Sequence, residues 1–251
     1  MKRISIEQFY LAHTPAIYRF IRFLSKDASK NDRFLAKDLT EKVLASSMSL
    51  YYEDFKQWND YRYDNEVIAL RMTEIKREIF KIAYNLIKTN SQANQSSIAI
   101  PLGTKLSLTL QEAALAALFF QEKWELPAIK EMLLALDADI NITMVNLWSK
   151  VLGAQLGKLQ ELCEGPCVLT KNTYMLIGLR RPVPATMITH WHQCKNCQQM
   201  ESLLFEEEKR IMQNFLLAGE DDIQEEMRAF LRVWMSKLEK ENKKTQHFGQ
   251  L

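Results

Sequence analysis

One short segment in the last third of the chain carries the residue types of a metal site. His190, Cys194 and Cys197 stand there in a His-x3-Cys-x2-Cys pattern. Positions i, i+4 and i+7 of a helix share one face, so the imidazole and both thiolates would point to the same side. Such a set supplies three corners of a tetrahedral zinc site with bonds of about 2.0–2.3 Å. The spacing therefore predicts bound Zn²⁺, with Cys163 or Cys167 upstream, or His192 within the segment, as candidates for the fourth ligand.

Two other interpretations of these cysteines stay open. The four thiols can serve as small core residues, with His190 hydrogen-bonded at the surface, or the Cys-x2-Cys pair can be a redox site. Polar Lys195 and Asn196 lie between the last two cysteines, which disfavours a buried apolar face. No βαβ pattern surrounds the pair, which disfavours the redox site. Zinc binding is the favoured interpretation.

Elsewhere the sequence carries no residue pattern typical of a catalytic site. His13 stands alone in an amphipathic stretch, and His247 lies near the end of the chain. Acidic runs such as Glu206 to Glu208 are typical of solvated helix faces. The glycine-rich patterns that bind nucleotide phosphates are absent. We therefore expect a protein that is not an enzyme.

The elements that would position these residues are helical. Of the 251 residues, 47 % are hydrophobic and 25 % charged, which is typical of a folded chain. The 7 glycines and 6 prolines are too few for the many tight turns of a strand-rich sandwich. Apolar residues recur at three- and four-residue steps nearly throughout, as at Ile75, Ile79, Ile82 and Leu86. The sequence predicts an all-α fold.

A polar stretch without charge or periodicity divides the chain and predicts a flexible linker at 89–105. It separates a helical domain at 1–88 from a second domain at 106–162, and a helical zinc-binding module follows at 163–251. The second domain fits a helix-turn-helix unit, although a generic three-helix bundle fits the periodicity equally well. Its expected helices are Leu108–Phe120, Ala128–Leu136 and Thr143–Leu162.

The same features bear on location and partners. No apolar run approaches the 18 residues of a membrane span, and the first residues lead into an amphipathic stretch and not a signal peptide. We therefore expect a cytoplasmic protein with reduced thiols. Lys and Arg number 33 against 31 Asp and Glu, and no segment is strongly basic. Contacts with nucleic acid phosphates would be few, or would be supplied by a partner.

Three short runs in the first domain carry a family resemblance. In order, Tyr18–Ile21, Ala36–Val43 and Phe80–Leu86 resemble segments of bacterial sigma factors of the extracytoplasmic-function type. The linker and the three-helix unit then fall where that family keeps its second DNA-binding domain. The resemblance covers about residues 5–162. Each match is short, and the specificity comes from their order and spacing together.

This resemblance implies a regulator of transcription initiation that binds the RNA polymerase core and promoter DNA. Asp38, Leu39 and Glu41 match positions at which the family engages the clamp helices of the polymerase. The two domains would then be sigma-like, the first for polymerase and the second for the upstream promoter element.

The recognition helix that the resemblance implies, Met144–Lys150, carries a single cation, Lys150. Because Lys and Arg supply most of the affinity for duplex DNA, binding to a promoter would be weak or would depend on a partner. The residues expected to contact DNA are Asn146, Trp148 and Lys150.

The His-x3-Cys-x2-Cys segment resembles a different family, the zinc-containing anti-sigma domain. That domain has a Cys or His about 25 residues upstream of its helix, and Cys163 and Cys167 bracket this spacing. The resemblance implies Zn²⁺ ligands at Cys163, His190, Cys194 and Cys197, and a regulatory protein partner. The alternative function is an interaction protein with a structural zinc, which does not bind DNA and sequesters a sigma factor or another partner.

Overall fold

A computed structural model describes most of the chain in segments. These are residues 5–25, 32–58, 65–90, 98–101, 105–133, 139–144, 146–147, 150, 185–199, 202, 205–206, 209 and 223–248. The chain forms two compact units, one of Met1–Asn94 with Ala218–Leu251, the other of Gln95–Leu217. The all-α prediction is confirmed, since the described segments are helical apart from one short hairpin and a few residues between elements.

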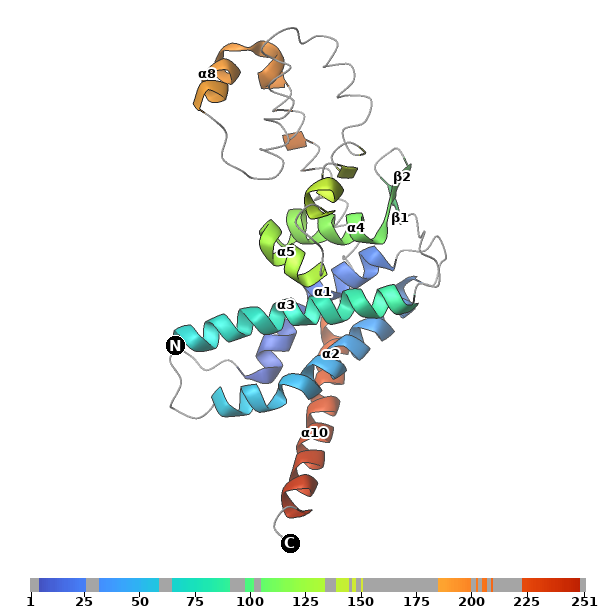
Figure 1. The fold of residues 1–251 in the computed structure, drawn as a ribbon. Helices are drawn as coiled ribbons and strands as arrows, with labels where there is room; N and C mark the ends of the chain where they lie inside the picture. Colours follow the sequence, from blue (N-terminus) through green and yellow to red (C-terminus); the bar gives the residue numbers. More distant parts are fainter. Residues whose placement is uncertain are drawn as a thin grey trace. The chain divides into compact units, whose positions relative to one another are not determined.

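The described part of the first unit consists of four helices, which Figure 1 labels α1, α2, α3 and α10. They are α1 (Ile6–Leu24), α2 (Asp32–Trp58), α3 (Asn65–Asn90) and α10 (Gln224–Phe248). α1 begins with a capping box in which the Ser5 hydroxyl accepts from the Gln8 N–H and the Gln8 side chain accepts from the Ser5 N–H, both at 3.1 Å. This pair satisfies two N–H groups at the start of the helix.

Large aromatic and aliphatic side chains fill the interior between these helices. Phe20 on α1 meets Phe80 on α3 edge to face, with 5.1 Å between ring centroids. One buried polar contact joins α1 to α2, where the Tyr10 and Ser47 hydroxyls lie 2.8 Å apart. A buried hydroxyl costs free energy unless it is paired, so this bond fixes how the two helices align. Fully buried side chains of the core include Tyr18, Ile21, Leu44, Met48, Ile75 and Ile79.

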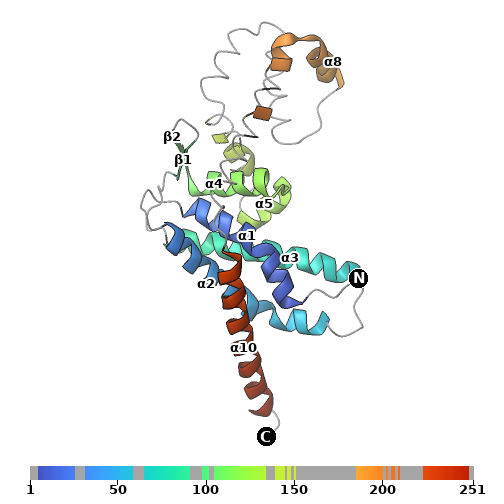
Figure 2. The same ribbon diagram turned by 180° about the vertical axis from the view of Figure 1, so that it is seen from behind.

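α10 packs on helices from the other end of the chain. Both views show its first part crossing α1 and α2, while the rest of the helix extends beyond them (Figures 1 and 2). Ile223, Met227, Leu231 and Leu238 are buried at helical spacing, and these side chains need an apolar partner face. The structure therefore divides the chain differently from the predicted single module at 163–251, because the part from 218 onward completes the first unit.

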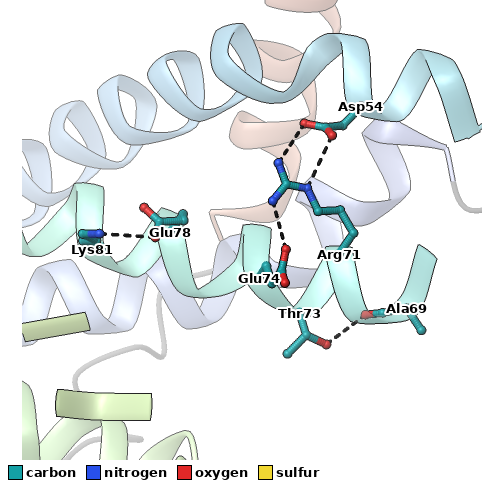
Figure 3. Close-up of polar contacts among 7 residues, drawn as sticks. All are labelled: Asp54, Ala69, Arg71, Thr73, Glu74, Glu78 and Lys81. Atoms are coloured by element: carbon teal, nitrogen blue, oxygen red, sulfur yellow. Dashed lines mark hydrogen bonds and ion pairs between the residues drawn. The ribbon is translucent and has the colours of Figure 1, made fainter. Parts of the chain in front are cut away.

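A half-buried arginine ties α2 to α3. Arg71 on α3 donates to both carboxylate oxygens of Asp54 on α2, each at 3.4 Å, and to Glu74 at 2.9 Å (Figure 3). Its guanidinium also lies 5.7 Å from the ring centre of Tyr51 on α2. A planar guanidinium can serve several acceptors and an aromatic face together, which a lysine cannot.

The second unit opens with a hairpin in part of the segment predicted as a flexible linker. Strands β1 (Ile98–Pro101) and β2 (Lys105–Leu108) pair antiparallel, with Ile98 opposite Leu108. Part of the predicted flexible linker at 89–105 is therefore paired as strands. At its start, α3 continues to Asn90.

Three of the helical segments of this unit come directly after the hairpin. α4 (Leu110–Ala116) continues as the π-helical segment η1 (Ala117–Gln121), and α5 (Leu126–Leu133) comes next. α4 begins two residues later than predicted because Thr109 is its N-cap. Residues 139–144 are also helical, so the third predicted helix begins before Thr143. Most of that helix beyond residue 147 lies outside the described residues.

The two helical segments α4 and η1 supply most of the buried side chains in the described part of this unit. Every side chain from Ala113 to Phe120 is buried, so the helix is apolar on all sides, as is typical of a core helix. Among the described helices of both units, none has the length and hydropathy needed to cross a membrane.

Candidate metal centre and interaction residues

The predicted His-x3-Cys-x2-Cys residues lie at the end of one helix, at the break after it and in the helical residues that follow. Helix α8 (Ala185–Gln193) carries His190, and helical residues resume at Lys195 after a break at Cys194. Hydrogen bonding continues across the break, because the Cys194 N–H donates to the His190 carbonyl at 2.9 Å. The helical spacing that the sequence analysis assumed is therefore kept over this step.

Gln198 also stabilises the break between α8 and the helical residues that follow. The Gln198 N–H donates to the Cys194 carbonyl at 3.1 Å, and its side-chain amide donates to the His192 carbonyl at 2.8 Å. Carbonyls in the last turn of a helix have no partner within that helix. Gln198 satisfies one of them and so holds the Cys194–Cys197 turn against the end of α8.

This arrangement brings three ligand atoms together. The imidazole of His190 and the sulfurs of Cys194 and Cys197 all lie within 4.8 Å of one another. Cys197 is fully buried, and the other two residues are half-buried. A His/Cys/Cys group of this kind could hold a metal ion. The predicted fourth ligand, Cys163, and its alternative, Cys167, lie outside the described residues.

The donor set fits zinc better than a hard cation. Two thiolates and one imidazole are ligands typical of zinc, whereas magnesium and calcium prefer oxygen. In a tetrahedral site with bonds of about 2.0–2.3 Å, ligand atoms lie about 3.3–3.8 Å apart. Each pair of ligand atoms would therefore approach by at most about 1.5 Å on binding an ion, a change that rotamer adjustment can supply.

The residues predicted to contact polymerase divide between surface and core. Asp38 is exposed and accepts from the Lys42 ammonium at 2.6 Å, and Glu41 is half-buried on the same helix. Leu39 is 4 % exposed and belongs to the core of the first unit. Asp38 and Glu41 can therefore meet a partner through their side chains, whereas Leu39 contributes to the packing of α2.

The residues predicted to contact DNA also differ in whether a partner could reach them. Asn146 is exposed, and Trp148 lies outside the described residues. The Lys150 ammonium lies 2.6 Å from the carboxylate of Glu112, whose side chain is 6 % exposed. The single cation of the expected recognition helix is therefore bound within its own unit.

Glu112 is the residue that the sequence analysis missed here. Its carboxylate accepts from the Thr109 N–H at 2.8 Å, and the Thr109 hydroxyl accepts from the Glu112 N–H at 3.2 Å. The Thr-x-x-Glu spacing of a capping box was the sequence signal that could have located it. The carboxylate thus serves the start of α4 and the Lys150 ammonium together.

No protein-family model, curated protein or solved structure matches this chain. The sigma-factor and anti-sigma resemblances therefore rest on the residues quoted above. The chemistry of the candidate metal centre rests on the geometry of its three ligands.

Proposed function

We propose that this chain is a sigma-factor-like regulator of transcription initiation that acts in the cytoplasm and carries an attached zinc module. Its main partner would be the RNA polymerase core, bound through the α2 surface of Asp38 and Glu41. The observation that supports this proposal best is the exposure of Asp38 on a helix of the first unit, at a position matching the polymerase contacts of the resembling family.

The metal in this proposal is Zn²⁺, held by His190, Cys194, Cys197 and, from the spacing of the resembling family, Cys163. Bound zinc would supply cross-linking of the chain, because a closed tetrahedral Cys/His site stabilises a fold and leaves no open position for a substrate. The chain's own contribution is the Gln198 contact, which orients the Cys194–Cys197 turn toward His190.

One observation favours a second candidate, an interaction protein that does not bind DNA. Lys150 is paired with a buried carboxylate, so it contributes less to neutralising a phosphate than a lysine in solvent would. In this case the chain would bind polymerase or a sigma factor and sequester it, with the zinc site as a structural element.

One assay of the full chain distinguishes the two candidate functions. Purified protein is tested for retention on immobilised RNA polymerase core and, in parallel, for run-off transcription from a set of promoter fragments. Retention with promoter-dependent transcripts would support the regulator. Retention without transcripts would support sequestration, and no retention would contradict the polymerase-binding proposal.

A further inference from the structure

α10 packs on both α1 and α2, and we call the surface that these two helices present to it the groove. Three side chains at the start of α10 are buried against this surface. Ile223, just before the helix, is 2 % exposed, and Met227 and Leu231 are fully buried. Successive members of this set are four residues apart, so they form one apolar stripe along α10.

Two ion pairs flank the groove and give it a direction. Near the start of α10, the Glu226 carboxylate contacts the Lys37 ammonium of α2. Six residues later, the Arg232 guanidinium lies 3.3 Å from the Glu7 carboxylate of α1. The groove therefore offers a cation to the beginning of the bound helix and an anion further along. A helix of the opposite polarity would place like charges together at both positions.

α10 is far along the chain from the helices on which it packs. α1 to α3 are consecutive in the chain, whereas the whole of the second unit, Gln95–Leu217, separates them from α10. Nothing in the contacts themselves distinguishes the α10 of the same chain from that of another copy. Only the local concentration imposed by the intervening chain favours the intramolecular arrangement.

We propose that the groove between α1 and α2 is an exchangeable helix-binding site, and that its second occupant is α10 of another copy of this chain. Two copies would exchange α10 reciprocally and form a closed, two-fold dimer with the same contacts as the monomer. An empty groove is a poor alternative, because it would expose the apolar surface that now covers Met227 and Leu231. This inference does not depend on the proposed function.

Charge reversal tests the exchange directly. A groove variant carries Glu7→Lys and Lys37→Glu, and a helix variant carries Glu226→Lys and Arg232→Glu. Within each variant both ion pairs become like-charge contacts. In a dimer of one groove variant with one helix variant, all four exchanged contacts are attractive. Each exposed pair changes an equilibrium by about two- to fivefold, so we expect at least about tenfold more dimer in the mixture than in either variant alone.

The measurement is native mass spectrometry with one variant ¹⁵N-labelled, after equilibration at a temperature that allows α10 to detach. The expected result is a mixed dimer that prevails over both pure dimers. The chain carrying all four changes is the matched control, since its intramolecular pairs are restored, and it should be as monomeric as the unaltered chain at the same concentration.

Two results would overturn the proposal. One is a mixture in which no mixed dimer exceeds the pure dimers, while circular dichroism shows both variants folded. The other concerns variants that are unfolded alone. Exchange predicts that mixing restores their helical signal, and a mixture that stays unfolded contradicts it.

Discussion

His190 and His192 provide a matched pair of residues for testing the metal centre. Both lie on α8, but only His190 belongs to the group with Cys194 and Cys197. We expect one Zn²⁺ per chain in the unaltered protein and in His192→Gln, and loss of stoichiometric zinc in His190→Gln and Cys197→Ser. Elemental analysis of protein purified without a histidine tag measures this. Equal zinc in all four proteins would exclude the assigned ligands.

Asp38 is the residue on which polymerase binding can be tested most directly. It is exposed, and its partner Lys42 belongs to the same helix, so Asp38→Lys should leave the fold intact. A charge-assisted contact is worth about 1.5–3 kcal/mol, so we expect about 10- to 100-fold weaker binding to the polymerase core. Ser46→Lys, also exposed on α2, is the control for added charge. Indistinguishable affinities of the two variants would count against the proposed surface.

His13 gives the first unit a dependence on pH. It packs against Phe9 with 4.7 Å between ring centroids, and burial, aided by the charge of Lys76, lowers its pKa from 6.5 to about 4. Between about pH 6.5 and pH 4, the unfolded chain therefore binds a proton at His13 that the folded chain does not bind. Stability contributed by neutral His13 is complete above about pH 6.5 and is lost as the pH falls toward 4.

The variant His13→Gln isolates this effect, since it removes the titrating group. We expect the loss of stability between pH 6.5 and 4, measured as the midpoint of thermal unfolding, to be smaller in the variant than in the unaltered protein. Parallel curves for the two proteins over this interval would assign the pH dependence to other groups.

At the scale of single elements, the Glu112–Lys150 contact joins the start of α4 to the expected recognition helix. Lys150→Met would leave a nearly buried carboxylate with the Thr109 N–H as its remaining donor among the described contacts. An unsatisfied buried group costs about 1–3 kcal/mol, so we expect destabilisation of this size in urea unfolding. Asn146→Ala, at an exposed position nearby, should change stability by less than about 0.5 kcal/mol.

A second change separates the contact from a general effect of losing Lys150. Glu112→Gln removes the charge that needs the lysine, so the double variant should be less destabilised than the sum of the single variants. Additive effects would show that the two residues act independently. The same series tells a loss of DNA binding by Lys150 variants apart from a loss of fold.

Helices were the elements that the sequence predicted well. The stripe of Ile75 and Ile79 does lie in the core, because a period of 3.6 residues marks which face is buried. The hairpin was missed because its strands, such as Ile98–Pro101, are too short for a clear alternation and adjoin a polar stretch. The spacing of His190, Cys194 and Cys197 was sufficient to identify the candidate metal centre. Their helical register is local, so no distant contact had to be known.

At the scale of the whole molecule, the periodicity of the sequence could not predict which helices α10 packs on. An amphipathic helix shows that one of its faces is buried, but not which element covers that face. This helix was therefore predicted to belong with its neighbours in the chain, at 163–251. In the structure its partners are α1 and α2, reached after a complete second unit. For the same reason the burial of Leu39 beside exposed Asp38 required the three-dimensional structure.

Two apolar residues of α10 test whether this helix is integral to the first unit. Leu231 is fully buried, whereas Val233, two positions on, is 71 % exposed. Truncation of a buried leucine costs about 2–5 kcal/mol, so Leu231→Ala should strongly lower the unfolding free energy of this unit. Val233→Ala should change it by less than about 0.5 kcal/mol. Equal effects in chemical denaturation would show that α10 adds little to the bundle.

The position of α10 in the chain also sets the order in which the protein can be completed during synthesis. α1 to α3 leave the ribosome first, but their last partner helix is translated only after the whole of Gln95–Leu217. At about 5–20 residues per second, the intervening unit takes roughly 6–25 s to make. During that interval the nascent bundle presents an uncovered apolar groove. A chain that terminates early would keep it uncovered, and so would be recognisable to chaperones and proteases as unfinished.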